Sequence, residues 1–109
     1  MSVTLVVHAR GVCVDGCDHE PVDAGHVEKC IAWIRHHAKR GSVPNRWTTS
    51  YGWKHEVERE HGYVSNGSLI VAAIREGYTP HEAGLGSPNL CFNMWPAGAA
   101  EIPLIRGLR

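Results

Sequence analysis

The chain has 109 residues, of which 11 are Lys or Arg and 11 are Asp or Glu, so its formal net charge is zero. This balance excludes a histone-like polycation and an acidic tail protein, and 43% hydrophobic with 20% charged residues is ordinary for a globular domain. Apolar runs fall short of the roughly 18 residues that a membrane span needs. The amino-terminal segment lacks the basic start of a signal peptide, so we expect a cytoplasmic protein with reduced cysteines.

Residues 1–41 predict a strand, a tight turn that carries two cysteines, and a helix. The β-branched run at 3–7 is typical of a strand. Asp23 is a suitable N-cap, good helix formers continue to Arg40, and Gly41 is a helix terminator. We expect a ββα-like unit resembling a zinc finger.

A linker and two helices are predicted next. The proline and asparagine within residues 42–49 are typical of a linker. A helix is expected over 50–60, ending at Gly62, and a second helix is expected after Val64, ending at Gly77. Two short helices joined by a turn that contains glycine are typical of a helix-turn-helix.

The last part of the chain predicts a β-hairpin and a tail. Two extended segments within residues 78–95 flank a Gly-rich loop, as in a hairpin. This hairpin would be the wing of a unit spanning 50–95, and residues 96–109 form a tail broken by Pro and Gly. The predicted fold is α+β, with a zinc-stapled ββα-like unit packed on a winged helix-turn-helix-like unit.

The spacing of cysteine and histidine predicts a structural zinc site. Cys13, Cys17, Cys30 and His36 form the string C-x3-C-x12-C-x5-H, close to the C-x2–4-C-x12-H-x3–5-H spacing of zinc fingers. Zinc takes four nitrogen or sulfur ligands in a tetrahedron. The turn would bring two thiolates together, and the helix would present the other pair.

Other ligand sets and a site without metal are open alternatives. His26 gives the rival string C-x3-C-x8-H-x3-C, and His37 and His19 are further candidates. Without metal, Cys13 and Cys30 would be small core residues, and a disulfide is the third alternative. Cys91, in an apolar segment, is predicted to belong to the core.

The start of the second helix in the 50–95 unit supplies candidate base contacts. In a helix-turn-helix the second helix enters the major groove with its amino-terminal residues, here Ser65, Asn66 and Ser68. Asparagine can bind adenine with two hydrogen bonds, and serine reaches bases or phosphates. A homodimer would reach two half-sites. The candidate phosphate contacts are Arg75, Lys54 and Arg59.

These residues also have structural interpretations. Ser65 or Asn66 can cap the helix that follows. Lys54, Glu58 and Arg59 can form a solvated face with ion pairs one helical turn apart.

The predicted function is therefore DNA binding through the helix-turn-helix, with zinc in a structural role. A protein-binding module without DNA contact is the alternative function, and zero net charge favours this alternative. Trp47 and Trp95 are candidates for its contact surface, whereas Trp33 and Trp53 fit core positions. The sequence has no nucleophile motif, phosphate-binding glycine loop or dinucleotide fingerprint. We therefore expect a protein that is not an enzyme.

A set of short stretches in the second half of the chain forms one recognisable pattern. The stretches are Ser50-Tyr-Gly-Trp-Lys-His55, Glu58, Tyr63-Val-Ser-Asn-Gly67, Ile70, Ala72-Ala73, Gly77-Tyr78, Ser87-Pro-Asn89 and Phe92-Asn-Met94. This pattern resembles a group of small uncharacterised proteins of actinobacterial phages and prophages. The resemblance implies a phage accessory protein that acts inside a bacterial host cell, and it implies no chemical activity. In that setting the alternative protein-binding module would take part in host takeover by inhibiting or redirecting a host protein.

Overall fold

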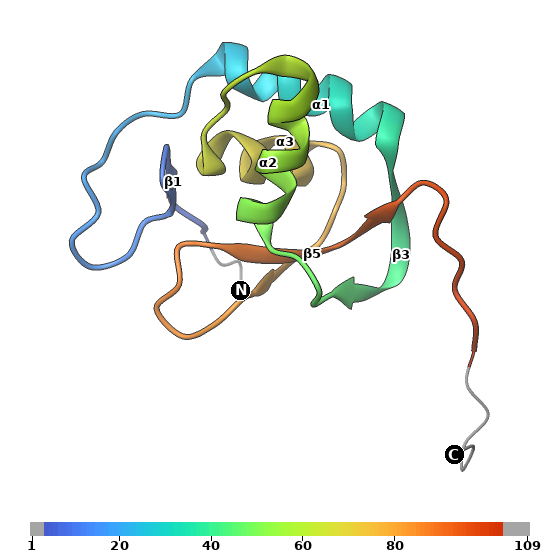
Figure 1. Ribbon diagram of the computed structural model, residues 1–109. Coiled ribbons are helices and arrows are strands. Elements are labelled where there is room, and N and C mark those ends of the chain that lie inside the picture. Colours follow the sequence, from blue (N-terminus) through green and yellow to red (C-terminus); the bar gives the residue numbers. More distant parts are fainter. Residues whose placement is uncertain (1–3, 104–109) are drawn as a thin grey trace.

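The computed structural model describes residues 4–103, which form three helices and two small antiparallel sheets (Figure 1). The predicted α+β class is confirmed. Along the chain the elements are β1 (Val7–His8), β2 (Gly11–Val12), α1 (Ala24–His37), β3 (Ala38–Asn45), α2 (Ser50–His61), α3 (Asn66–Arg75), β4 (Pro80–Glu82) and β5 (Leu90–Pro96).

The first sheet is a short hairpin. Of the predicted strand 3–7, Val3 lies outside the described residues and only Val7 belongs to β1. β1 pairs with β2, with Val7 opposite Val12. We call these two strands and their turn, residues 7–12, the N-terminal hairpin. The order strand, strand, helix is as predicted for the first block, and both strands precede Cys13.

β3 overturns the predicted linker. α1 ends at His37 and the chain continues directly into β3, so residues 42–45 are strand rather than linker. The helix formers Lys39 and Arg40 pair with β5 instead, because tertiary pairing overrides helix propensity. β3 begins in the first predicted block and runs into the predicted linker, and β5 comes from the 50–95 unit, so the two units share one sheet.

β5 is the central strand of this second sheet, which has the order β3-β5-β4. β4 and β5 are antiparallel, and Pro80 lies opposite Phe92, which confirms the predicted hairpin. β3 is an edge strand, a position that tolerates Pro44. Most apolar side chains of β5 are buried, including the predicted core residue Cys91, whereas Trp95 is partly buried: the buried ones are Leu90, Cys91, Phe92 and Met94.

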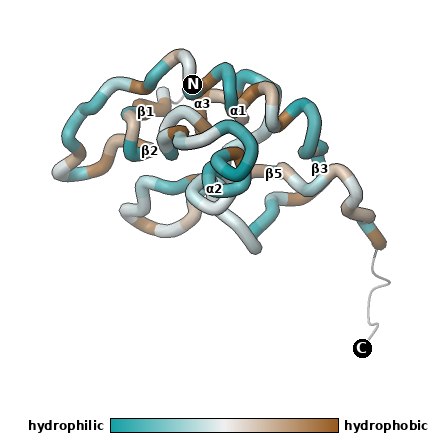
Figure 2. Tube along the Cα trace, turned by 45° about the horizontal axis from the view of Figure 1, so that its top comes forward, coloured by the Kyte–Doolittle hydropathy of each residue, from teal (hydrophilic) through white to brown (hydrophobic). Residues whose placement is uncertain are grey.

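The helices lie together on one side of this sheet (Figure 1). α3 is the most deeply buried of them, and its residues Leu69, Ile70 and Ala73 have no exposed surface. The rings of Trp33 and Trp53 meet edge to face at 5.8 Å, so the prediction that they belong to the core is confirmed. The outer surface of α2 is mostly hydrophilic (Figure 2). Within residues 4–103, none of the helices has the length and apolar character needed to cross a membrane.

The N-terminal hairpin docks on the amino end of α3. The Gly67 N–H donates to the Ala9 carbonyl at 2.9 Å, and the Val12 N–H donates to the Pro88 carbonyl at 2.8 Å. A Cβ atom at Gly67 would overlap the backbone carbonyl of His8. The hairpin therefore covers the first turn of α3 at a distance that only glycine allows.

Replacing Gly67 with alanine tests this close contact. Alanine normally stabilises a helix interior relative to glycine, but here the added methyl group must push the hairpin away. We expect Gly67→Ala to lower the free energy of unfolding by roughly 1–3 kcal/mol, the usual cost of overpacking. Chemical denaturation measures this change.

Gly84→Ala is the matched control, because a Cβ atom at Gly84 meets no other atom. Its stability should stay within about 0.5 kcal/mol of the wild type. Equal stability of the Gly67→Ala and Gly84→Ala variants would contradict the docking of the hairpin on α3.

Candidate functional site

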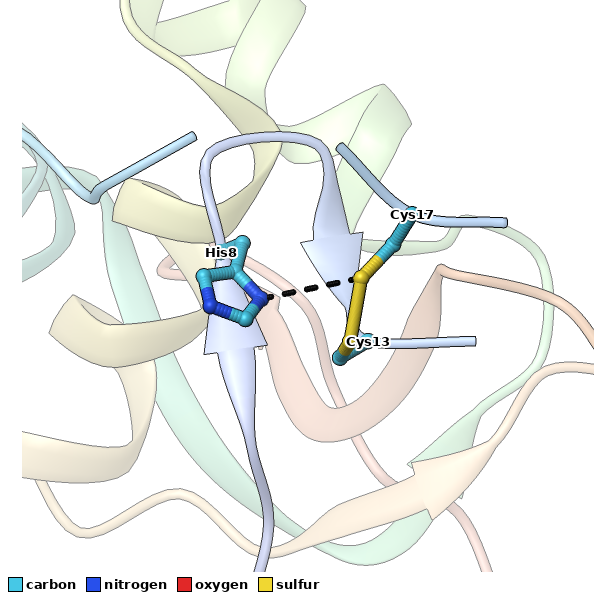
Figure 3. Close-up of side chains that lie close together, drawn as sticks. All are labelled: His8, Cys13 and Cys17. Atoms are coloured by element: carbon cyan, nitrogen blue, oxygen red, sulfur yellow. Dashed lines mark hydrogen bonds between the residues drawn. A yellow bond between two sulfur atoms is a disulfide. The ribbon is translucent and has the colours of Figure 1, made fainter. Parts of the chain in front are cut away.

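His8, in the N-terminal hairpin, forms a compact group with Cys13 and Cys17, which follow the hairpin in the chain (Figure 3). Their ligand atoms all lie within 4.8 Å of one another, and no other trio of His, Cys, Asp or Glu in residues 4–103 is gathered so closely. His8 Nδ1 is 3.8 Å from Cys17 Sγ. The two cysteines, with Cα atoms 5.7 Å apart, are joined as a disulfide. Reduced to thiolates, the group offers three ligands to a metal ion.

The structure brings together only two of the four predicted zinc ligands. Cys30 has no exposed surface and lies on the core face of α1. Burial, with a smaller contribution from the charge of Glu58, raises the pKa of the Cys30 thiol to about 12, although Lys54 opposes this. Because a metal binds the thiolate, Cys30 behaves as a core residue.

The predicted histidine ligands also lie outside the group. His36 is exposed, and its ring meets that of His37 at 4.7 Å. His37 Nε2 is 2.7 Å from a carboxylate oxygen of Glu60. The ring of the alternate ligand His26 packs edge-on against Tyr63. In the described part of the chain, none of the three joins Cys13 and Cys17.

Sequence reasoning missed His8 because the turn that positions it carries no strong turn signal before Gly11. The chain reverses at Ala9-Arg10, which places His8 opposite Gly11 and beside the segment that leads to Cys13. Gly11 has φ +129°, a conformation that glycine adopts readily. The sequence did contain one signal for His8. A histidine three residues before a glycine, followed by two close cysteines, is compatible with a tight hairpin that brings the histidine to the cysteines.

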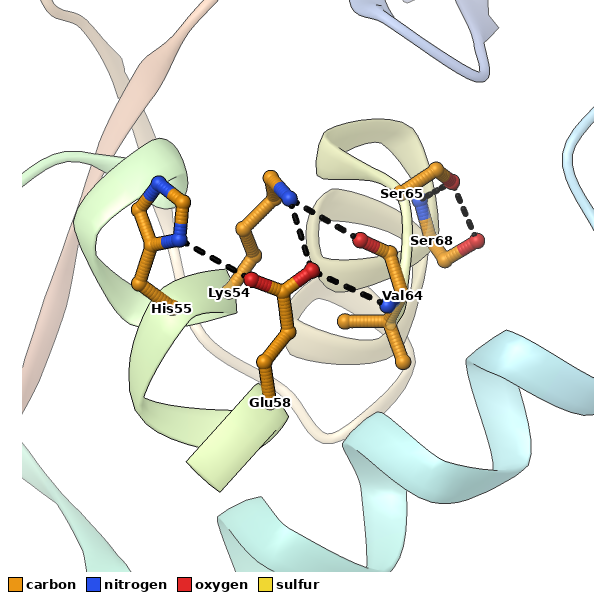
Figure 4. A network of polar contacts seen from close by, with 6 residues as sticks. All are labelled: Lys54, His55, Glu58, Val64, Ser65 and Ser68. Carbon is orange, nitrogen blue, oxygen red and sulfur yellow. Dashed lines mark hydrogen bonds and ion pairs between the residues drawn. The ribbon is translucent and has the colours of Figure 1, made fainter. Parts of the chain in front are cut away.

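Glu58 connects α2 with the loop that leads to α3 (Figure 4). Its Oε2 atom accepts hydrogen bonds from Lys54 Nζ at 2.9 Å and from the Val64 N–H at 3.3 Å. Its Oε1 atom lies 2.9 Å from His55 Nδ1. Burial alone would raise the pKa of Glu58, but the hydrogen bonds from Lys54, Val64 and His55 outweigh burial and hold it below its usual range.

Lys54, a predicted phosphate contact, is buried and forms its polar contacts within the protein. Its side chain is 8% exposed, and its amine also donates to the Val64 carbonyl at 3.2 Å. The same amine lies over the rings of Tyr63 and Tyr51, 4.7 and 5.5 Å from their centroids. Its charge is therefore neutralised by Glu58 and enclosed by aromatic rings, which leaves little of it for a phosphate.

Ser65 and Ser68, two predicted base contacts, bind each other at the amino end of α3, where Ser65 is the N-cap (Figure 4). Ser65 Oγ accepts a hydrogen bond from the Ser68 N–H at 3.1 Å and lies 2.6 Å from Ser68 Oγ. Ser65 is 4% exposed and Ser68 is not exposed at all. The capping interpretation of Ser65 is confirmed, and neither hydroxyl faces solvent.

Asn66, the third predicted base contact, is 4% exposed. Its amide nitrogen donates to the Arg10 carbonyl and to Asn89 Oδ1, both at 2.9 Å. The side chain therefore ties the N-terminal hairpin and the β4–β5 loop to α3. Its hydrogen-bond donors are used within the protein and are not offered to a base edge.

The predicted arginine contacts are exposed, but most cations of the fold are paired. Arg59 lies 3.6 Å from the Glu56 carboxylate, and Arg75 is exposed at the end of α3. Further cations bind acidic side chains, which offsets their charge, or backbone carbonyls, which hold the side chain in place but leave its charge intact. These pairs are Arg10 with Asp18, Arg35 with Glu76, Arg40 with the Gly77 carbonyl and Arg46 with the Glu82 carbonyl.

A polar pocket of about 540 Å³ lies where the N-terminal hairpin, α2, α3 and the β4–β5 loop meet. Aromatic and charged side chains share its wall, so it suits a group with an apolar body and a polar tip. Its lining includes Arg10, Glu20, Tyr51, Lys54, Tyr63 and Asn66.

No protein-family model, no curated protein and no solved structure matches this chain.

Glu58→Gln tests the network between α2 and α3. It removes the charge that neutralises the buried Lys54 amine, so we expect a loss of about 1–3 kcal/mol in the free energy of unfolding at neutral pH. Because the pKa of Glu58 is lowered in the folded state, its contribution is lost as the pH falls through that lowered value. The difference between variant and wild type should therefore shrink in acid, as measured by denaturation at a series of pH values.

Glu56→Gln is the control, because the Glu56 side chain is 47% exposed and its arginine partner is 79% exposed. It should change stability by less than about 0.5 kcal/mol. A pH-independent difference between Glu58→Gln and wild type would show that the charge of Glu58 is not what stabilises the fold.

Proposed function

We propose that the protein is a non-enzymatic binding module, built like a winged helix-turn-helix, that docks on another protein. In the setting implied by the resemblance to phage proteins, the partner is a protein of the bacterial host, bound inside the host cell. The order of α1, β3, α2, α3, β4 and β5, with the sheet order β3-β5-β4, supports this build. It is the element order of a winged helix domain, with the β4–β5 loop as the wing.

The observation that carries the proposal is the exposure of large apolar side chains at one end of the sheet. Trp47 is 92% exposed and Leu85 is 100% exposed. Arg46 donates to the Glu82 carbonyl at 2.7 Å, which brings the end of β3 to the end of β4, just before the loop that carries Leu85. Exposed tryptophan is typical of the anchor residues of protein interfaces.

Two exposed tyrosines at the pocket near α2 and α3 are also part of the proposed surface. Tyr51 is 50% exposed and Tyr63 is 66% exposed, and both line the pocket. Tyrosine is enriched in protein interfaces because it combines apolar area with a hydrogen-bonding tip. We call Trp47, Tyr51, Tyr63 and Leu85 the partner surface.

A structural zinc ion is part of the proposal. His8, Cys13 and Cys17 supply three of the four ligands that a closed zinc site takes. The ion would hold the cysteine loop against the N-terminal hairpin, and it would take no part in chemistry.

DNA binding is the second candidate function, and the winged-helix order of elements favours it. A homodimer would then place two copies of α3 on two half-sites. The burial of Ser65, Asn66 and Ser68 supports protein binding instead, because DNA reading by these residues requires the N-terminal hairpin to leave α3. Arg75 is available to DNA in either arrangement.

Trp47→Ala tests the partner surface. The protein is immobilised and exposed to a lysate of an actinobacterial host, and a retained protein is purified and titrated by calorimetry. Removing an anchor tryptophan costs at least about 2 kcal/mol of binding free energy, which is roughly a 30-fold rise in Kd. Because Trp47 is 92% exposed, the variant should unfold at the wild-type temperature.

Ile102→Ala is the matched control, because Ile102 is also a large exposed residue, at 79%, and lies beside Lys39 rather than on the partner surface. It should bind the partner with the wild-type Kd. Equal binding by wild type and the Trp47→Ala variant, or no host protein retained by wild type, would contradict the proposed function.

A further inference from the structure

His19 lies beside the His8, Cys13 and Cys17 group in an uncommon backbone conformation. Its φ is +57°, and it is the one non-glycine residue with positive φ in the described part of the chain. Histidine tolerates this left-handed conformation better than most residues, and such a conformation is often held at a functional site. The ring of His19 is 4.9 Å from the ring of His8, centroid to centroid, with 34° between the planes.

Three contacts hold His19 in this place. The Glu20 N–H donates to Asp18 Oδ1 at 3.2 Å, which closes a tight turn around His19. Asp18 also pairs with Arg10 at 2.8 Å, and the Ala9 N–H donates to the Glu20 carbonyl at 2.7 Å. The residues on both sides of His19 are thus anchored to the turn of the N-terminal hairpin, next to His8.

The carboxylate of Asp18, which precedes His19, is a weaker candidate for a fourth ligand. Both oxygens of Asp18 are already bonded, one to Arg10 and one to the Glu20 N–H. His19 is exposed and lies next to His8 but outside the group whose ligand atoms are within 4.8 Å of one another. Zinc binding therefore requires a rotation of the His19 side chain toward the sulfur atoms. Two cysteines with two imidazoles match zinc, which prefers sulfur and nitrogen in a tetrahedron.

A metal ion can reach the group from solvent. A cavity of about 340 Å³ borders it, and His8, Cys17 and Asp18 are among its lining residues. An entry path of this kind is a requirement of a metal site that loads after folding.

We propose that His8, Cys13, Cys17 and His19 bind one zinc ion. This deepens the structural zinc of the proposed function and does not depend on which partner the protein binds. All four ligands come from one short segment that starts in β1 and ends before α1. Cys30 and His36 take no part.

Zinc and the disulfide are alternative states of the same two sulfur atoms. A thiol or phosphine reductant supplies the two electrons that break the Cys13–Cys17 bond, and the sulfurs take up two protons as thiols. Zinc then replaces both protons and binds the two thiolates. In the zinc form the ion links His8, in the N-terminal hairpin, to the cysteine loop, so metal and hairpin docking on α3 should support each other.

The full chain, reduced with a phosphine and freed of metal, is titrated with Co²⁺ and then with Zn²⁺. We expect one equivalent to bind, with the absorption of tetrahedral Co²⁺ and a sulfur-to-cobalt charge-transfer band. His19→Gln should keep that band, since both thiolates remain, but should weaken Zn²⁺ binding. The loss should exceed the roughly 10- to 100-fold that follows removal of an outer hydrogen-bond partner of a ligand.

His36→Gln is the matched control, because His36 is also an exposed histidine and belongs to the originally predicted ligand set. It should bind zinc like wild type, and circular dichroism should show both variants folded. Wild-type affinity in the His19→Gln variant would overturn the fourth ligand and leave three-residue binding of zinc intact. If the reduced wild type binds no metal, the proposed zinc site is wrong. This result would leave the proposed capture of a partner through Trp47 untouched, because the Trp47→Ala experiment tests it independently.

Discussion

The docking of the N-terminal hairpin on the amino end of α3 is the contact on which the rest of the structure depends. A helix begins with N–H groups that have no partner within the helix. Here the Gly67 N–H binds the Ala9 carbonyl, and the Ser68 N–H binds Ser65 Oγ. Asn66 adds hydrogen bonds to the hairpin and to the β4–β5 loop. One helix end thus contacts both the N-terminal hairpin and the β4–β5 loop and is covered by them.

This occupation bears directly on function. In a helix-turn-helix the free amino end of the second helix is what a DNA groove receives, and in this protein the hairpin takes that place. Several positive charges are also offset within the fold, since Lys54 pairs with Glu58, Arg10 with Asp18 and Arg35 with Glu76. The surface that stays open is apolar and aromatic, around Trp47 and Leu85. These features together favour a protein partner.

Periodicity and capping residues predicted the elements of this fold better than its long-range contacts. The sequence indicated the helices, the C-terminal hairpin, the Ser65 cap and the buried Trp33 and Trp53, since each depends on local patterns or apolar character. It did not reveal β3, because pairing with β5 depends on a strand far along the chain. Cys13 and Cys17 were predicted to meet across a turn, but His8 depends on an unsignalled hairpin turn. Zinc-finger spacing pointed to Cys30, which the packing of α1 places in the core.

The central claim is that the amino end of α3 is sealed and that the protein binds no nucleic acid through it. Fluorescence anisotropy of a labelled mixed-sequence duplex, titrated with the tag-free protein over a series of salt concentrations, tests this most directly. The account predicts no rise in anisotropy even at about 50 mM salt, where phosphate contacts are strong. Two results together would contradict this claim. The logarithm of the association constant would fall linearly with the logarithm of salt concentration, and an Asn66→Ala variant that remains folded would no longer bind the duplex.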